Sequence, residues 1–186
     1  MKLNIPNLLT LIRISLIPIF VLIFYCPFQL NHLVTAIIFT IAAVTDLLDG
    51  YLARKLKQVS PLGEFLDPVA DKLMVAVALV LLVQAYPSAW LAVPAAIIVG
   101  REIVISALRE WMSELGKRQR VAVKGIGKFK TAAQMISILL LLSQDPQNIN
   151  WITRLGYGLL YIAAFLTLWS MVVYLRAAWE ELQNTT

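Results

Sequence analysis

The sequence predicts an all-α fold, an integral membrane bundle of six transmembrane helices with a short interfacial segment at the N-terminus. Of its 186 residues, 60% are hydrophobic, against about half in a typical soluble domain. The excess falls into long uncharged runs, and each run approaches the roughly 20 residues that a helix needs to cross a bilayer. Because these runs take up most of the chain, we expect residues 1–186 to form a single membrane domain.

Six apolar runs are the predicted spans: residues 8–24, 32–54, 61–86, 88–115, 127–142 and 151–175. Residues 1–7 are short and mixed in character, which suits a segment lying at the membrane surface. Pro27 marks the connection that follows the first span. The second span ends in a short basic loop that contains Lys57. Ser60 and Pro61 are a typical N-cap and first helical residue, so they predict where the third span begins.

The last three spans carry more charge near their ends. Pro87 begins the turn into the fourth span, which is interrupted by Arg101 and Arg109. Residues 116–130 contain six Lys or Arg and no acidic residue, and they lead into the fifth span. Residues 143–150 form a polar loop with an Asp-Pro turn before the sixth span, and a charged tail closes the chain.

The distribution of charge between spans predicts the orientation in the membrane. The connections after the second and fourth spans, together with both termini, hold nearly all the Lys and Arg outside the spans. The positive-inside rule therefore places these segments on the cytoplasmic side of the membrane. Lys57 and Arg120 should face the cytoplasm, and Asn31 and Asn148 should face outside. Arg154 is the one exception to this charge distribution, because it lies just inside the sixth span on the side predicted to face outside.

Composition also argues against several classes of protein. The single cysteine, Cys26, cannot form an intrachain disulfide, and the lone His32 offers no zinc site. The formal charge of +5 is not arranged as a basic surface with interleaved aromatic residues, so we expect no nucleic-acid partner. Basic residues beside membrane spans suit anionic lipid and phosphorylated ligands instead.

Four aspartates at helical spacings are the main candidate site. Asp46 and Asp49 are three residues apart, Asp67 and Asp71 are four apart, and each pair shares one face of a helix. The connection between the two helices is short, so we expect an antiparallel hairpin that brings the carboxylates together. Like charges gathered near a membrane face repel one another unless hard divalent cations neutralise them. The pattern therefore predicts a metal site for Mg²⁺ or Mn²⁺.

Such a site suits chemistry on a lipid diphosphonucleotide. A pair of cations can clamp a diphosphate, and a carboxylate at the edge can take a proton from an attacking alcohol. Gly50 and Ala53 are small enough to admit a nucleotide close to the backbone, and Arg54 offers a planar fork for phosphate. The substrate would combine lipid tails with a soluble head.

A second group of basic residues is the candidate acceptor site. Arg101 and Arg109 are eight apart and share a helix face, with Ser106 close to the same stripe. Lys128, Lys130 and Thr131 stand at the start of the fifth span. Such a pocket suits an acceptor with its own phosphate, such as glycerol 3-phosphate. The alternative is that Arg109 and the lysines snorkel to lipid headgroups, and that Glu102 beside Arg101 belongs to a structural network.

The aspartate motif resembles the signature of the CDP-alcohol phosphatidyltransferase family. The pattern D-x-x-D-G-x-x-A-R, eight residues and G-x-x-x-D-x-x-x-D is matched at every defining position: Asp46, Asp49, Gly50, Ala53, Arg54, Gly63, Asp67 and Asp71. The resemblance implies that an alcohol attacks CDP-diacylglycerol and that CMP leaves. It makes the first three aspartates metal ligands and Asp71 both base and ligand, with a pair of ions expected. It also implies that Gly50, Ala53, Arg54 and Gly63 line the nucleotide, and that the protein is a homodimer.

Three further segments narrow the resemblance. Residues 4–13, 101–110 and 127–131 are similar to those of bacterial members whose acceptor is glycerol 3-phosphate. By that resemblance Asn7, Thr10 and Arg13 approach the nucleotide or diphosphate; helix capping and headgroup contact are the alternative.

Other functions stay open. Inositol phosphate, serine or phosphatidylglycerol could replace glycerol 3-phosphate as acceptor. An ion-coupled transporter could also use paired intramembrane aspartates, and inverted repeats with broken helices would support it. The sequence contains neither signal.

Overall fold

The computed structural model describes residues 5–56, 61–114 and 124–183, and every regular element in these ranges is a helix. Six helices follow one another: α1 (Ile5–Tyr25), α2 (Asn31–Leu56), α3 (Pro61–Ala85), α4 (Ala89–Glu114), α5 (Lys124–Leu142) and α6 (Trp151–Gln183). The predicted all-α bundle of six helices is confirmed. For some residues near helix ends, among them 47–56 and 61–65, the description covers the backbone only.

Three helix ends differ from the prediction by three residues or more. Helix α1 already begins at Ile5, so part of the expected interfacial segment belongs to the helix; residues 1–4 lie outside the described part of the chain. Helix α5 begins at Lys124, three residues before its predicted start at 127. Helix α6 continues to Gln183, eight residues past its predicted end at 175. The extension is rich in Ala, Glu, Leu and Gln, which have high helix propensity and can continue the helix beyond the apolar run.

Polar side chains cap the helices that begin at the loops. The Asn150 side-chain oxygen accepts hydrogen bonds from the backbone N–H groups of Ile152 (2.9 Å) and Thr153 (3.0 Å), which fixes the start of α6. The Asn31 side-chain oxygen accepts one from the N–H of His32 at 2.8 Å, at the start of α2.

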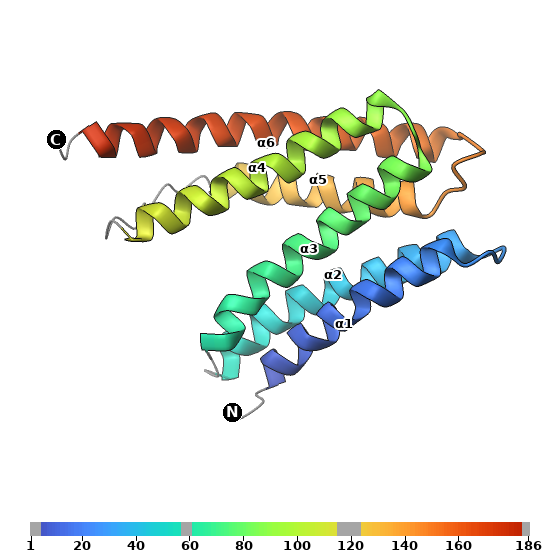
Figure 1. Cartoon of the computed structure of the whole chain (residues 1–186), viewed down its shortest axis with the longest axis horizontal. Helices are drawn as coiled ribbons and strands as arrows, with labels where there is room; N and C mark the ends of the chain where they lie inside the picture. Colours follow the sequence, from blue (N-terminus) through green and yellow to red (C-terminus); the bar gives the residue numbers. More distant parts are fainter. Residues whose placement is uncertain (1–4, 57–60, 115–123, 184–186) are drawn as a thin grey trace.

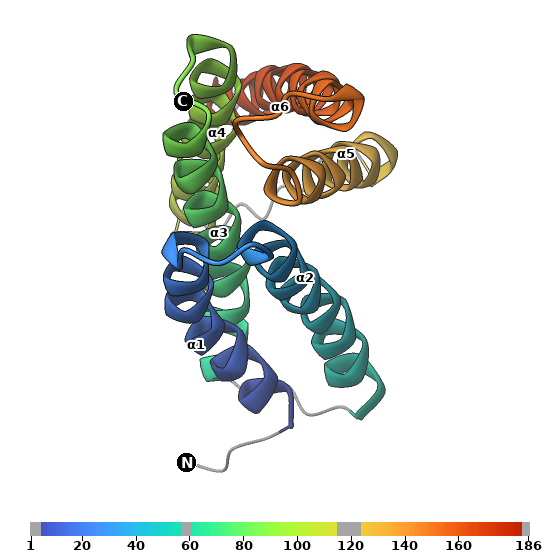
Figure 2. The same cartoon turned by 90° about the vertical axis from the view of Figure 1, so that its right-hand side faces the viewer.

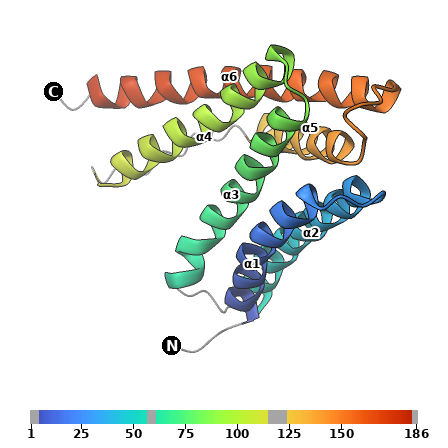
Figure 3. The same cartoon turned by 45° about the vertical axis from the view of Figure 1, so that its right-hand side comes forward.

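The six helices form two groups that α3 connects. Helices α1, α2 and α3 contact one another, and α6 packs along both α4 and α5. Figure 2 shows the two groups end on, with α4–α6 above α1 and α2. Helix α3 also contacts α4 and α5, and Figure 3 shows it crossing from one group to the other. The two halves of the aspartate motif lie near the end of α2 and the beginning of α3, at the lower left of Figure 1.

The connections alternate between the two ends of the bundle. The described loops 26–30, 86–88 and 143–150 lie at one end, on the right in Figure 1. The helix ends next to the basic connections lie at the other end. This is the alternation that the loop charges predict. Lys57 and Arg120 are outside the described residues, and the side of the membrane that each end faces stays a prediction.

The outer surface of the bundle is apolar. Large side chains such as Trp90 (74% exposed), Phe165 (66%) and Val80 (64%) point outward, while Phe20, Phe39 and Leu82 are buried between helices. An outward apolar surface suits lipid as the solvent. Within the described residues, three helices are long and apolar enough to cross a membrane, over Leu8–Tyr25, Ala89–Met112 and Trp151–Arg176. The chain is thus a helical membrane protein, and six crossings remain the predicted number.

Helices α5 and α6 approach each other closely at a glycine. A Cβ atom added to Gly156 would lie 2.9 Å from Cγ of Leu141, closer than real Cβ contacts allow. Beside it, the buried Ser137 hydroxyl donates to the Gly156 carbonyl at 2.7 Å. Small residues let membrane helices pack at short range where polar groups can bond across the interface. This packing fixes α5, and with it Lys130, against α6.

Candidate active site

The first motif aspartate is paired with a buried arginine from α1. Nη1 of Arg13 lies 2.6 Å from Oδ1 of Asp46, and the Arg13 side chain is only 1% exposed. Thr10, one turn earlier on α1, is also buried. Arg13 is therefore held inside the bundle next to the motif and does not reach out to lipid headgroups.

The last motif aspartate stands on α3, within electrostatic range of the first. Asp71 is an exposed residue that lines the cavity described below, and the charges of Asp46, Arg13, Glu102 and Lys72 act on its partly desolvated carboxyl group. Helices α2 and α3 run antiparallel and pack together, as the motif predicts for its two halves. The remaining motif positions are divided between the two helices. Helix α2 contains Asp49, Gly50, Ala53 and Arg54, and α3 contains Gly63 and Asp67. The side chains of those residues lie outside the described part of the structure.

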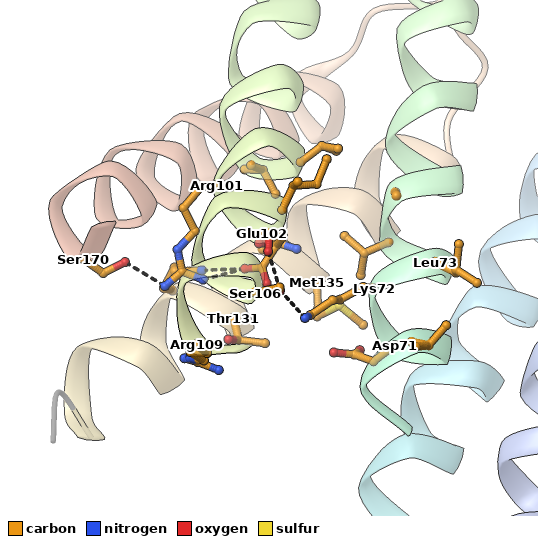
Figure 4. Close-up of a pocket in the computed structure, with 18 of the residues that line it drawn as sticks. Asp71, Lys72, Leu73, Arg101, Glu102, Ser106, Arg109, Thr131, Met135 and Ser170 are labelled. Atoms are coloured by element: carbon orange, nitrogen blue, oxygen red, sulfur yellow. Dashed lines mark hydrogen bonds and ion pairs between the residues drawn. The ribbon is translucent and has the colours of Figure 1, made fainter. Parts of the chain in front are cut away.

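A single cavity connects Asp71 with the basic residues of the other helices. Its volume is about 770 Å³, and its walls come from α3, α4, α5 and α6. Figure 4 shows Asp71 and Lys72 entering it from α3, opposite Arg101, Ser106 and Arg109 of α4. Leu73 and other apolar side chains complete the wall on the α3 side. The cavity therefore has a charged interior next to an apolar wall.

Two nearly buried cations in this cavity share one carboxylate. Oε1 of Glu102 lies 2.6 Å from Nη1 of Arg101 and 3.2 Å from Nζ of Lys130. Arg101 is 9% exposed and Lys130 is 5% exposed, so each would be costly to bury without a counter-charge. Nη2 of Arg101 also donates to the Ser170 hydroxyl of α6 at 3.2 Å, whereas its buried Nε has no hydrogen-bond partner among the described residues.

A third cation, Arg109, lies at the rim. Its guanidinium carbon is 5.4 Å from the centre of the Tyr174 ring on α6, a cation–π distance, and its Nη2 is 3.5 Å from the Tyr174 hydroxyl. Tyr174 holds the guanidinium against α6 while Arg109 remains exposed. Thr131 of α5 lines the same part of the cavity (Figure 4).

The described residues that line the cavity carry a net positive charge. Four of its side chains are cationic, from Lys72, Arg101, Arg109 and Lys130, and two are carboxylates, from Asp71 and Glu102. With all six ionised, the difference is a charge of +2. A doubly charged anion of modest size fits this balance.

Comparison of the sequence with known proteins identifies its family. The family model described as CDP-alcohol phosphatidyltransferase matches residues 3–169. The chain therefore belongs to the CDP-alcohol phosphatidyltransferase family. Proteins of this family generally depend on divalent metal ions. Membership favours a transferase over the ion-coupled transporter that the aspartates alone leave open.

Curated bacterial relatives of this transferase are similar over nearly their whole length. The chain is 57% identical over 182 residues to a protein of Pseudomonas fluorescens, covering 97% of this chain and 93% of the relative. It is 57% identical to proteins of Yersinia pestis (strain Pestoides F) and Pectobacterium atrosepticum, covering 98% of each chain. All three are named CDP-diacylglycerol--glycerol-3-phosphate 3-phosphatidyltransferase.

The structure of this transferase brings most of the expected acceptor residues together. Arg101, Arg109, Lys130 and Thr131 all line the cavity that contains Asp71. Lys128 lies on α5, but its side chain is outside the described residues, as is that of Asn7 on α1. Thr10 and Arg13 are not among the described residues that line this cavity; both are buried on α1, where Arg13 pairs with Asp46.

Several residues of the cavity have no role predicted from the sequence. Lys72 on α3 donates to the Ser106 hydroxyl on α4, although the two are 34 residues apart. Ser170 and Tyr174 on α6 contact Arg101 and Arg109, respectively. Spacing offers one signal, because residues 170 and 174 are four apart and share a helix face. Nothing in the sequence shows that this face turns toward α4.

Proposed function

We propose that this chain transfers the phosphatidyl group of CDP-diacylglycerol to a hydroxyl of glycerol 3-phosphate, giving phosphatidylglycerophosphate and CMP. The observation that carries the proposal is the cavity that connects the motif aspartate Asp71 to Arg101, Arg109 and Lys130. The relatives' names state the same donor and acceptor. Donor chemistry and acceptor binding would thus take place in one cavity.

The aspartates would hold divalent cations, Mg²⁺ or Mn²⁺, as a pair of ions bound by Asp46, Asp49, Asp67 and Asp71. Asp46 and Asp71 fit this role, because they stand on α2 and α3, which pack together, and their carboxylates supply hard oxygen ligands. The described residues alone contain no group of three ligands, and the side chains of Asp49 and Asp67 would be needed to complete the site. When bound, the ions would neutralise the diphosphate and polarise its phosphorus.

Asp71 would act as the base. A hydroxyl of the acceptor loses its proton to the Asp71 carboxylate as its oxygen forms a bond to the phosphorus next to diacylglycerol. The bond from that phosphorus to the bridging oxygen breaks, and CMP departs with this oxygen. The exposure of Asp71 toward the cavity supports the role, because the acceptor can reach the carboxylate from that side.

The acceptor phosphate would bind to Arg101, Arg109, Lys128, Lys130 and Thr131. The balance of charge supports this role, because a phosphate monoester with two negative charges matches a cavity whose described residues leave +2. The Nε of Arg101, which has no partner in the described part of the chain, is a buried donor that could bind a phosphate oxygen. A neutral acceptor such as serine would leave these cations uncompensated.

The nucleotide end of the donor would lie toward the α1–α3 group. By family resemblance Asn7, Thr10, Arg13, Gly50, Ala53, Arg54 and Gly63 would contact the CDP moiety. Arg13 would act beside Asp46, since the two are already paired. In this position a guanidinium can stabilise both a metal-binding carboxylate and a neighbouring diphosphate.

In the cell, the active site and both termini would face the cytoplasm. The water-soluble glycerol 3-phosphate and CMP would then enter and leave from the cytoplasmic side. Loop charge supports this orientation, and the apolar outer surface supports contact with membrane lipid along the bundle. Residues 1–186 would act as one domain. A homodimer is proposed on family resemblance alone.

A screen of acceptors with purified protein tests the proposal. CDP-diacylglycerol in detergent is mixed with glycerol 3-phosphate, inositol phosphate, serine or phosphatidylglycerol, and both CMP and the lipid product are measured. We expect rapid CMP release with glycerol 3-phosphate only, its loss after chelation, and recovery with Mg²⁺ or Mn²⁺. Release with another acceptor would change the assigned substrate. Absence of release with every acceptor would contradict the assignment as a transferase.

A further inference from the structure

A lysine–serine bridge crosses the cavity between the proposed base and the proposed phosphate site. Lys72 directly follows Asp71 on α3, and its Nζ donates to the Ser106 hydroxyl on α4. Figure 4 shows this bridge between Asp71 on one side and the cluster of Arg101 and Glu102 on the other. An acceptor that extends from the side of Arg101 to Asp71 would lie alongside the bridge.

The bridge has unused hydrogen-bonding capacity of both kinds. The Ser106 hydroxyl donates to the Glu102 carbonyl at 2.5 Å and accepts from Lys72, so one of its two lone pairs remains. The Lys72 ammonium has three N–H groups, and among the described residues only Ser106 takes one. Lys72 and Ser106 are half-buried and line the cavity. The bridge therefore offers both donors and an acceptor to a ligand.

We propose that Lys72 and Ser106 bind the central, non-reacting hydroxyl of glycerol 3-phosphate and so determine acceptor specificity. This inference rests on the proposed function. Glycerol 3-phosphate has two hydroxyl groups; the terminal one attacks, and the central one lies between it and the phosphate. A hydroxyl can accept from Lys72 and donate to Ser106 at the same time, whereas a methylene group can do neither.

The contacts of Lys72 and Ser106 would distinguish acceptors with the central hydroxyl from acceptors without it, which the phosphate contacts cannot do. Arg101, Arg109 and Lys130 hold the phosphate of any phosphorylated alcohol equally well. An acceptor without the central hydroxyl would leave the lysine and the serine without their ligand, which a polar site penalises. Loss of a hydrogen bond to a charged group corresponds to about a 10- to 100-fold change in specificity.

The test compares two acceptors that differ only in that hydroxyl. Glycerol 3-phosphate and 3-hydroxypropyl phosphate are each varied with the wild type, Lys72→Met and Ser106→Ala, and kcat/KM is measured. We expect the wild type to prefer glycerol 3-phosphate by about 10- to 100-fold. In both variants the preference should fall toward one, mainly because glycerol 3-phosphate becomes the poorer substrate.

Arg109→Gln is the matched control. This change should slow both acceptors alike, because both carry the phosphate, and should leave the preference unchanged. An unchanged preference in Lys72→Met and Ser106→Ala would overturn the inference and make the bridge a structural link between α3 and α4. A wild type without preference would overturn it as well. A wild type that does not use glycerol 3-phosphate would instead contradict the proposed function itself, and the inference with it.

Discussion

At the scale of single residues, the site depends on how buried charges are compensated. Arg101 and Lys130 are nearly buried, and they share a single carboxylate, that of Glu102. One carboxylate cannot neutralise two cations, so the pair keeps a positive charge that an anionic substrate can satisfy. Asp71 differs, because it is exposed to the cavity and no hydrogen bond to a described residue holds it in place. Such a carboxylate is suited to receive a proton.

Asp71→Asn should therefore suppress the chemical step and leave binding largely intact. The amide keeps the size of the carboxyl group but cannot accept the proton of the attacking hydroxyl. We expect kcat to fall by about 100- to 10,000-fold, the usual contribution of a general base. The KM for glycerol 3-phosphate should change much less. Steady-state kinetics on the purified variant, with both substrates varied, provide the measurement. A raised KM with kcat preserved would show that Asp71 binds substrate and is not the base.

The sequence predicted the acidic and basic members of the site but not their partners. Spacing along one helix placed Asp46 with Asp49 and Arg101 with Arg109, because three- and four-residue steps define a face. The pair of Arg13 with Asp46 joins residues 33 apart, and that of Lys72 with Ser106 joins residues 34 apart. Such pairs depend on how helices rotate and tilt against each other, and no single-sequence pattern encodes this.

At the scale of helices, hydropathy located the elements well and their ends less well. Every predicted apolar run coincides with a helix, and most helix ends agree within two residues. The larger errors are at Ile5, Lys124 and Gln183, where the helix extends beyond the apolar run. Hydropathy measures where lipid contact ends, whereas helix hydrogen bonds can continue into water. The close contact of α5 with α6 at Gly156 also had no sequence signal that separated it from other glycines.

Gly156→Leu should destabilise the bundle by separating α5 from α6. Its Cβ alone would meet Leu141 at 2.9 Å, and the larger side chain would force the helices apart. Overpacking of this kind typically costs about 1–3 kcal/mol. Thermal unfolding in detergent, followed by circular dichroism, should show a lower midpoint than the wild type.

Gly158→Leu is the control for this substitution. Nothing lies within 4 Å of a Cβ built at Gly158, two residues further along the same helix. Its midpoint should stay close to that of the wild type. Equal loss in both variants would mean that leucine perturbs α6 itself, and that the contact with Leu141 is not the cause.

At the scale of the whole molecule, the bundle is apolar outside and polar where α3 meets the second group. Exposed tryptophans such as Trp90 and Trp151, 74% and 72% exposed, surround it, whereas Arg101 and Lys130 are turned inward. Loops alternate between the two ends (Figure 1), so one end is rich in Lys and Arg and the other is not. Asp71, Arg109 and Lys130 of the proposed active site lie toward the helix ends that adjoin the basic connections.

The topology can be tested by labelling single cysteines in intact cells. In a background with Cys26 replaced, we expect Asn148→Cys to react with a membrane-impermeant reagent and Lys57→Cys to react only after the membrane is opened. Loop charge is the physical reason, because positively charged loops are retained in the cytoplasm. Labelling at position 57 in intact cells would reverse the orientation and place the active site outside.

The central claim is that the cavity next to Asp71 holds the phosphate of the acceptor. Arg109→Gln tests it most directly, because Arg109 is exposed at the rim and its loss leaves the buried pair of Arg101 and Glu102 intact. Loss of one charge-assisted contact corresponds to roughly 1.5–3 kcal/mol, or about a 10- to 100-fold rise in KM for glycerol 3-phosphate, with KM for CDP-diacylglycerol nearly unchanged. An equal rise for both substrates, or no rise for either, would contradict the claim.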